Sequence, residues 1–130
     1  MELRKAISKR KSVRRFKGDL TFKEIAAILL YATKIPSAGA LYPLTVEING
    51  TPWATFFIIC ADFSKTTAKY GDRGIRYVYM EAGHLAQNIQ LLATEMGLGS
   101  CCLGAFNENR LKDICKLKND PIYLVSAGHI

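Results

Sequence analysis

The longest regular pattern of apolar and polar positions runs from Tyr70 to Phe106. Apolar residues recur there every three or four positions, which predicts one long amphipathic helix. The residues that set this period are Ile75, Val78, Tyr79, Ala82, Leu85, Ala86, Ile89, Leu92, Ala93 and Met96. Asp72 is suited to cap the start of the helix, and Gly97 and Gly99 are suited to end it. About 23 residues at ~1.5 Å each give a rod of roughly 35 Å, long enough to cross the domain.

The opposite face of this helix is also poor in charge. It carries Tyr77, Met80, Gly83, His84, Gln87 and Leu91. A helix that is apolar on most sides needs cover on most sides, and a chain of 130 residues has little else to supply it. We therefore expect a second subunit on this face, with Ala82, Gly83 and Ala86 allowing its close approach. Burial inside a single domain is the alternative.

Shorter patterns precede the long helix. Residues 2–10 predict a short helix with Leu3 and Ile7 inward. Thr21 and Glu24 match a capping box, which predicts a helix that ends before Pro36. Its expected inward residues are Ile25, Ile28, Leu29 and Ala32. Alternation over 44–48 predicts a strand, followed by a two-residue hairpin turn at Asn49-Gly50. The return strand over 54–61 is apolar on both faces and is therefore expected at the centre of the sheet.

Further short elements follow the return strand and the long helix. Residues 62–70 are polar and are expected to form a connection, and Ser100 to Leu103 and residues 121–127 predict two more strands. Asn107 is expected to cap a short helix that buries Leu111, Ile114 and Cys115. Mixed helices and strands with a hairpin indicate an α+β fold, in one domain over residues 1–130.

The composition is that of a globular protein, with 49% hydrophobic and 22% charged residues. No apolar run approaches the ~20 residues that span a bilayer, and the N-terminus has no signal-peptide core, so we expect a cytoplasmic protein. The four cysteines have no C-x-x-C or metal-ligand spacing, and there are only two histidines, so no metal site is expected. No catalytic side chain stands out.

The positive charge is concentrated at the N-terminus. Residues 1–20 hold eight basic and two acidic residues, while the whole chain has a net charge of +7. A phosphate-bearing ligand, a nucleic acid or simply a solvated helix face can explain such a segment. In an extended segment Ser12, Arg14 and Phe16 share one face, which places a hydroxyl and a guanidinium together for gripping a phosphate or a polyol.

Two loops are further candidates for ligand binding, and the common nucleotide-binding motifs are absent. The loop 36–43, with sequence PSAGALYP, is rich in small residues and exposes backbone amides, which suits a flat ligand or a plain connector equally. A glycine-containing turn follows at 103–106. There is no G-x-G-x-x-G and no P-loop. A basic grip with little acid–base machinery is typical of a protein that holds a cofactor and leaves the chemistry to it.

Four motifs in this order resemble the nitroreductase family of flavin enzymes: Arg10–Arg14, PSAGALYP, YGDRGIRYVYMEAGHLAQN and MGLGSCCLGAF. The similarity is greatest to the branch that includes the azoline dehydrogenases. The resemblance implies an α+β sandwich that forms a homodimer with FMN at each subunit interface. It also implies a ping-pong transfer of electrons from NAD(P)H to a small-molecule acceptor such as a quinone or a nitroaromatic compound.

The resemblance also implies roles for particular residues. Arg10, Ser12 and Arg14 would hold the flavin phosphate, ribityl chain and pyrimidine edge, and Lys11 lies in the same motif. The partner subunit would supply Ser37, Ala38, Gly39 and Ala40. Leu103, Gly104 and Ala105 would lie against the ring, with a backbone N–H near flavin N5.

The chain departs from the family pattern in three places. Many members have Asn where Ala40 stands, and most have a long insertion where the predicted Asn49-Gly50 turn stands. Most also continue past the position of His129 with a basic residue for the phosphate, so His129 is the local substitute. The adjacent Lys69-Tyr70 is similar to a pair that the azoline dehydrogenases are thought to use in catalysis.

Two other functions are consistent with the sequence. A flavin-binding protein without efficient turnover is favoured by the reduced lid over the site. A nucleic-acid-binding module would use the basic N-terminus, although the rest of the chain is near neutral and contains no reader motif.

Overall fold

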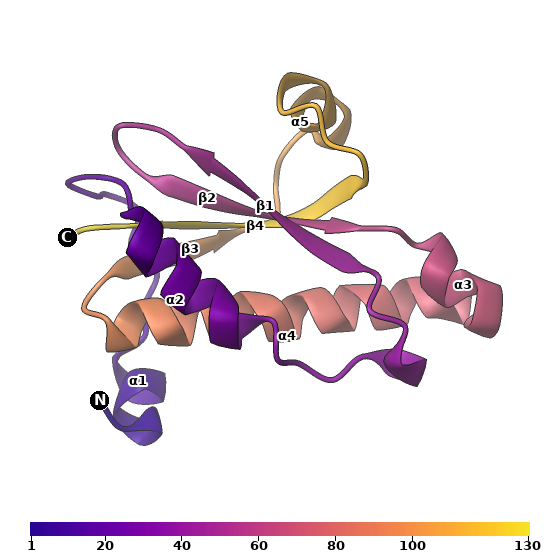
Figure 1. Cartoon of the computed structure of the whole chain (residues 1–130), viewed down its shortest axis with the longest axis horizontal. Coiled ribbons are helices and arrows are strands. Elements are labelled where there is room, and N and C mark those ends of the chain that lie inside the picture. The colour runs from indigo at the N-terminus through magenta and orange to yellow at the C-terminus, as the bar shows by residue number, and fades with distance from the viewer.

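A four-stranded antiparallel sheet with the strand order β1-β2-β4-β3 organises the computed structural model, which describes residues 1–130 (Figure 1). The strands are β1 (Leu44–Gly50), β2 (Thr55–Ala61), β3 (Gly99–Leu103) and β4 (Asp120–Gly128). The helices are α1 (Leu3–Lys9), α2 (Phe22–Ala32), α3 (Ser64–Tyr70), α4 (Arg73–Glu95), α5 (Glu108–Ile114) and the 3₁₀ turn η1 (Ala38–Ala40). This is the α+β arrangement that the sequence predicts, with β2 between two neighbours.

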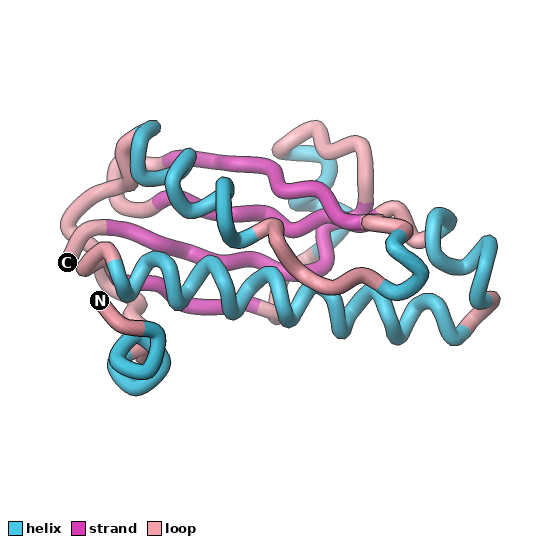
Figure 2. Tube along the Cα trace, turned by 60° about the horizontal axis from the view of Figure 1, so that its bottom comes forward, coloured by secondary structure: helices cyan, strands magenta, loops and turns pink.

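Helices cover the two faces of the sheet unequally. Figures 1 and 2 show α2 and the long α4 along one face, with α1 beside one end of α4, whereas α5 lies alone over the other face. Alternate residues of β2 face the two layers: Phe57 and Ile59 pack in the large core under α4, and Ile58 and Cys60 pack under α5. The α5 face is therefore only partly covered.

The long helix is confirmed as α4, and its inward face is the one that the period predicts. Val78, Leu85 and Ile89 are fully buried in the large core. The prediction is wrong at Ile75 and Tyr79, which are exposed at the end of α4 that extends beyond the sheet. Asp72 stands at the N-cap position but has helical backbone angles and makes no capping hydrogen bond with its side chain.

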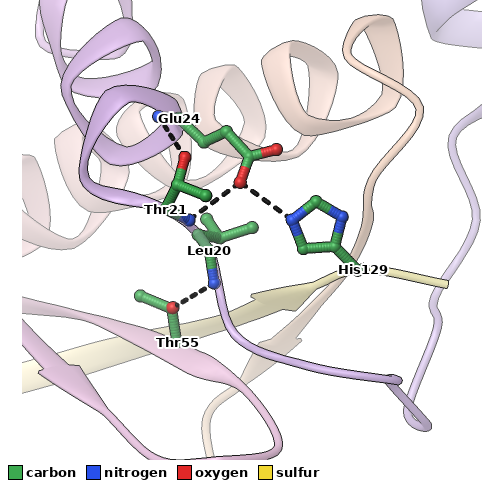
Figure 3. A network of polar contacts seen from close by, with 5 residues as sticks. All are labelled: Leu20, Thr21, Glu24, Thr55 and His129. Carbon is green, nitrogen blue, oxygen red and sulfur yellow. Dashed lines mark hydrogen bonds and ion pairs between the residues drawn. The ribbon is translucent and has the colours of Figure 1, made fainter.

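The start of α2 is fixed by the predicted capping box, which Figure 3 shows in its surroundings. The Thr21 N–H donates to Glu24 Oε1 at 2.8 Å, and the Glu24 N–H donates to the Thr21 hydroxyl at 3.2 Å. His129 Nε2 lies 2.8 Å from the same Glu24 oxygen. The Leu20 N–H donates to Thr55 Oγ1 at 2.9 Å and so ties this corner to β2. The C-terminal end of the chain thus closes onto the first turn of α2.

The capping box makes folding stability depend on pH. Burial by itself raises the pKa of the Glu24 carboxyl, but hydrogen bonds from Thr21 and His129 outweigh it and hold the pKa below the usual 4.5. A lowered pKa stabilises the fold above the unfolded value, and that contribution disappears as pH falls through the folded value. Glu24→Gln is therefore expected to lower the unfolding free energy by about 1 kcal/mol at pH 6, with a smaller difference below pH 4. Urea unfolding of both proteins across this range measures the difference, and a difference independent of pH would contradict the role of the carboxylate.

Several local predictions are wrong, each for a physical reason. In α1 the buried residue is Ala6, while Leu3 and Ile7 are exposed, because about two turns of helix do not define an inner face by their own pattern. The hairpin turn lies at Thr51–Ala54 rather than at Asn49-Gly50, since the Thr51 hydroxyl accepts from the Ala54 N–H at 3.1 Å and the ladder continues through Gly50.

Two further corrections concern α3 and α5. Residues 64–70 form the helix α3 and not a loop. Thr66 is the buried residue of this helix and packs against Gly74 of α4. A Cβ at Gly74 would come within 3.0 Å of the Thr66 backbone, so the close contact requires glycine. The Asn107 cap of α5 is confirmed, because its side chain accepts from the Arg110 N–H at 2.9 Å. Ile114 was expected to be buried but is 68% exposed.

The basic segment after α1 crosses the end of the sheet in an extended conformation. The Val13 N–H donates to the Ser100 carbonyl at 2.9 Å, and the His129 N–H donates to the Gly18 carbonyl at 2.9 Å. A Cβ at Gly128 would come within 2.8 Å of Phe16, which shows how closely the segment packs against β4. The backbone of the segment is therefore part of the fold, which fixes the points from which its side chains extend.

Candidate active site

The predicted phosphate-binding segment Arg10–Arg14 lies beside β3, which is an edge strand. Ser12 forms a bridge with Ser100 at the start of the strand, with its own side chain exposed. The Arg10 charge acts on the thiol of Cys102, two residues further along the strand. Burial raises the pKa of that thiol against the effect of Arg10, so Cys102 is a poor nucleophile. The same edge of the sheet thus carries both Ser12 and Arg10.

A cavity of about 730 Å³ opens beside this edge, on the α5 face of the sheet, over the part that α5 does not cover. We call it the Trp53 cavity, and its main lining residues are Arg14, Arg15, Phe16, Trp53, Phe56 and Leu103. Two residues from the predicted flavin set, Arg14 and Leu103, therefore share one cavity. Arg14, Arg15 and Phe16 all line the cavity, while Ser12 does not, so the cavity does not separate the alternating face that the sequence predicts.

The turn after β3 presents free backbone donors. Gly104 and Ala105 are exposed, and neither N–H donates a hydrogen bond within the chain. Their neighbour Leu103 packs against the small core under α5 and keeps the turn attached to the sheet. Two unpaired N–H groups at a fixed edge are suited to donate hydrogen bonds to a ligand's heteroatoms, and they bond to water while no ligand is present.

The 36–43 loop adopts an unusual backbone conformation. Gly39, Ala40 and Tyr42 have positive φ angles of 64°, 53° and 45°. The Tyr42 N–H donates to Ser37 Oγ at 3.0 Å, and the Ala40 N–H donates to the Ser37 carbonyl at 2.9 Å. The N–H groups of Ala38 and Gly39 remain unpaired. The loop is thus a folded turn and not a plain connector, and it leaves two backbone donors without a partner in the chain.

Lys69 and Tyr70 at the end of α3 pack against this loop. A Cβ at Gly39 would lie 2.8 Å from the Tyr70 hydroxyl and 3.1 Å from Lys69 Nζ. Tyr70 is held in turn by an edge-to-face contact with Tyr77 of α4, with ring centroids 5.2 Å apart. The Lys69-Tyr70 pair that the sequence singles out therefore borders the predicted loop of the cofactor site.

Gly39→Ala is expected to lower the unfolding free energy by about 1–2 kcal/mol, because alanine at φ +64° is strained. The added methyl group also displaces the Tyr70 hydroxyl. Urea denaturation measures the change. Ala40→Gly is the matched control, since glycine relieves strain at φ +53° and should leave stability nearly unchanged or raise it slightly. Equal losses in both variants would show that the loop does not hold this backbone conformation in solution.

Glu81 is a buried carboxyl that the sequence does not single out. It is 4% exposed and lies on α4 beneath the 36–43 loop, where it lines a cavity with Ser37 and His84. Burial raises the pKa of Glu81, against the opposing effects of a hydrogen bond with Ser37 and the charge of His84. Because Ser37 also accepts from Tyr42, Glu81 supports the turn from below.

Comparison with known proteins identifies the protein family and the fold. Residues 47–129, more than half of the chain, match the model of the Nitroreductase family. A protein of Methanocaldococcus jannaschii with the name "Putative nitroreductase MJ1384" is 32% identical over 180 aligned positions, which cover 98% of this chain and 91% of the relative. The chain belongs to the nitroreductase family.

Solved structures in this family share the fold at low sequence identity. The NfrA1 nitroreductase of B. subtilis superimposes with a TM-score of 0.84 at 18% identity, covering 98% of this chain and 66% of the other. A nitroreductase family protein of Streptococcus pneumoniae TIGR4 gives a TM-score of 0.87 at 15% identity, with coverage of 98% and 90%. The alignment with the archaeal relative spans 180 positions and this chain has 130 residues, so at least 50 positions of that alignment have no counterpart here.

In this nitroreductase-family chain, the two segments predicted to bind flavin, Arg10–Arg14 and Ser37–Ala40, lie far apart. The 36–43 loop packs near Met80 of α4, whereas α1, which leads into Arg10, packs near Leu92. Twelve residues of helix place these points roughly 18 Å apart along α4. Figure 1 shows α1 and the short turn before β1 at well-separated places along α4. Arg10–Arg14 and Ser37–Ala40 are therefore not brought together within one chain.

Sequence reasoning missed three residues of the Trp53 cavity and the support from Glu81. Arg15, Trp53 and Phe56 come from three separate segments, so no local motif contains them. A single Trp within the turn sequence Thr51-Pro52-Trp53 was an available signal, because turns are usually small and polar. His129, the expected phosphate substitute, is engaged with Glu24.

Proposed function

We propose that this nitroreductase-family chain is an FMN-dependent oxidoreductase that transfers electrons from a reduced nicotinamide to a quinone, a nitroaromatic compound or a similar acceptor. The observation that supports this best is the edge of β3, where the basic segment, Arg14, Leu103 and the free N–H groups of Gly104 and Ala105 meet. Cationic side chains suit a phosphate, and apolar contact with free donors suits the polar edge of a flat ring. The whole chain acts as one domain.

The residues present fit FMN by their chemistry. Arg10, Lys11, Ser12 and Arg14 supply four polar groups, and the chain contains no ion pair that would occupy either arginine. When bound, FMN supplies the redox chemistry, and the chain's part is to bind, orient and shield it. The Gly104 and Ala105 N–H groups can orient the ring and stabilise negative charge on its reduced edge without a titrating side chain.

The cofactor site is proposed to be completed by a second copy of the chain. The 36–43 loop, with residues Ser37, Ala38, Gly39 and Ala40, lies too far from Arg14 to serve the same ligand within one chain. Antiparallel packing of two α4 helices would bring the region around Met80 of one chain against the region around Leu92 of the other. Gly83, His84 and Gln87 are exposed on α4 and available for this contact, whereas Ala82 and Ala86 are buried in the chain's own core.

A membership of the azoline-dehydrogenase branch is supported by the position of Lys69-Tyr70 against Gly39. In the proposed dimer this pair would reach the site together with the loop. None of the helices combines the length and the apolar composition that crossing a membrane requires.

The absorption spectrum of the freshly purified protein tests the proposal, together with mass spectrometry of what the denatured protein releases. We expect a yellow protein that releases about one FMN per chain and is reduced by NADH or NADPH. Colourless protein that also fails to take up added FMN would contradict the function as a flavoenzyme.

Two other functions predict different results. A flavin-binding protein without efficient turnover is favoured by the short Thr51–Ala54 loop, which leaves the site without a lid. It would be yellow but would not turn over NAD(P)H with an added acceptor. A nucleic-acid-binding module would bind DNA or RNA without flavin, with an affinity that falls steeply as salt rises.

A further inference from the structure

Among the acidic and basic residues of the chain, only Glu81 is buried, with 4% of its surface exposed. Taking a carboxylate out of water costs free energy unless hydrogen bonds compensate for the lost water. An apolar side chain of similar size would fill the same place at a lower cost. Packing alone therefore does not explain why a carboxyl stands at this position of α4.

Two cavities meet at Glu81. One has a volume of about 440 Å³ and is lined mostly by apolar residues of α2, β1 and α4, and by Tyr42. The other has a volume of about 280 Å³ and lies between α4 and the 36–43 loop, where Ser37 and His84 line it. Because Tyr42 lines the first cavity and Ser37 the second, Glu81 lies beneath both ends of the turn.

The Ser37 hydroxyl connects Glu81 to the turn. It accepts from the Tyr42 N–H at 3.0 Å, and it forms a hydrogen bond with the Glu81 carboxyl. A hydroxyl has one hydrogen to donate, and an ionised carboxylate can only accept, so Ser37 donates to Glu81 while it accepts from Tyr42. The carboxylate thereby fixes the hydroxyl in the orientation that receives the Tyr42 N–H.

The turn needs such a hold because its backbone is strained. Ala40 and Tyr42 are not glycines, yet their φ angles are 53° and 45°. Residues in this left-handed region cost free energy and persist only where neighbouring groups hold them. Tyr42 is 56% exposed, so the packing of its ring contributes only part of that hold. The hydrogen bond from the Tyr42 N–H to Ser37 closes the turn.

We propose that Glu81 is a positioning residue of the cofactor site. Through Ser37, its carboxylate holds the 36–43 turn in the conformation that leaves the N–H groups of Ala38 and Gly39 free for a ligand. The hold on the turn needs no cofactor, whereas its consequence for FMN rests on the proposed function. In the proposed dimer these two donors serve the cofactor site of the second copy.

The environment of Glu81 makes this hold costly. Burial raises the pKa of its carboxyl, and the hydrogen bond with Ser37 and the charge of His84 only partly oppose the rise. The titratable groups around it come from α4, the loop and α3, with none from α2 or β1: His84, Tyr77, Tyr42, Lys69 and Tyr70. A raised pKa means that stability falls as pH rises from the unfolded value of 4.5 through the folded value. The chain therefore loses stability where it keeps a carboxylate under the turn.

Hydrogen exchange of the Tyr42 amide in flavin-free protein, followed by NMR, tests the hold on the turn. Glu81→Leu removes the acceptor of the Ser37 hydroxyl and should speed this exchange about tenfold. Ser37→Ala should speed it at least as much, and the double variant should match Ser37→Ala, because both changes break the same chain of bonds. The melting temperature of Glu81→Leu at pH 7 should equal or exceed that of the wild type, whereas a merely structural Glu81 would lower it on removal.

FMN titration of the same variants tests the consequence for the cofactor site. Glu81→Leu should raise the dissociation constant about tenfold, and Glu81→Gln, which keeps an uncharged acceptor, about threefold. The ratio of Glu81→Gln to wild type should approach one at pH 4.5, which lies below the raised pKa of Glu81, because the protonated carboxyl is then also an uncharged acceptor. Other groups that titrate in this range, the FMN phosphate included, affect both proteins alike.

Gln90→Leu is the matched control, because Gln90 is another buried polar residue, 6% exposed and further along the same helix. It should leave Tyr42 exchange and FMN affinity at wild-type levels. Unchanged Tyr42 exchange in Glu81→Leu, or an equal acceleration in Gln90→Leu, would overturn the hold on the turn. Wild-type FMN affinity in Glu81→Leu, despite faster exchange, would overturn its role in the cofactor site. Faster exchange in a protein that never takes up FMN would support the hold on the turn while contradicting the flavoenzyme function.

Discussion

Arg14→Ala is expected to raise the dissociation constant of FMN about 10- to 100-fold and to leave the melting temperature of the flavin-free protein unchanged. A hydrogen bond to a charged group contributes roughly 1.5–3 kcal/mol, and 1.4 kcal/mol corresponds to a factor of ten. Stability should not change, because Arg14 is exposed and forms no ion pair within the chain. Equilibrium dialysis or quenching of FMN fluorescence measures the affinity.

Arg110→Ala provides the control for this measurement, since it removes the same charge from the exposed surface of α5, outside the basic segment. Its FMN affinity should match that of the wild type. An Arg14→Ala protein with a dissociation constant within about twofold of the wild type would remove Arg14 from the site. The position of the basic segment across the end of the sheet would then need another explanation, such as a nucleic-acid partner.

The features that sequence patterns predicted well are those in which one local period decides the outcome. Residues 73–95 form a helix because many turns repeat the same apolar face, and a long repeat leaves little choice of which side is buried. The capping box of Thr21 and Glu24 was predictable for a different reason, since it needs only two side chains three residues apart.

The predictions failed where tertiary contacts override a short local pattern. Ala6, and neither Leu3 nor Ile7, faces inward in α1, since docking against α4 chooses the face of so short a helix. The Asn49-Gly50 signal was overridden because both residues pair with β2, at Phe56 and Thr55, and the chain turns only afterwards. Helix α3 has no apolar period of its own and depends on the close contact of Thr66 with Gly74.

The candidate site was predictable only in part, because it is assembled from separate segments. The motifs identified Arg10–Arg14 and Leu103–Ala105 as candidate residues. In the structure both segments adjoin β3, because Ser12 pairs with Ser100 near the start of the strand and Leu103 is its last residue. The Trp53 cavity depends on how much of its own face of the sheet α5 covers, and no motif contains that information. The same holds for Glu81, because its interaction with Ser37 of the 36–43 loop cannot be predicted from its neighbours in sequence.

Gly83→Arg is expected to abolish the proposed dimer and, with it, tight FMN binding. Gly83 is exposed in the middle of α4, and a Cβ there would meet nothing within 4 Å, so the single chain can accept a larger side chain. In a symmetric dimer each added guanidinium would face the partner's helix, and like charges brought together in an interface cost several kcal/mol. The dissociation constant of the dimer should therefore rise at least about 100-fold.

Sedimentation equilibrium over a range of protein concentrations measures this change, with FMN titration in parallel. Gly83→Ala is the control: it should remain dimeric and gain up to about 1 kcal/mol of helix stability, because alanine loses less backbone entropy than glycine. A Gly83→Arg protein that stays dimeric would place the interface elsewhere. A monomeric Gly83→Arg protein that still binds FMN with wild-type affinity would mean that Ser37–Ala40 of a second chain are not needed, and that the edge of β3 holds the cofactor alone.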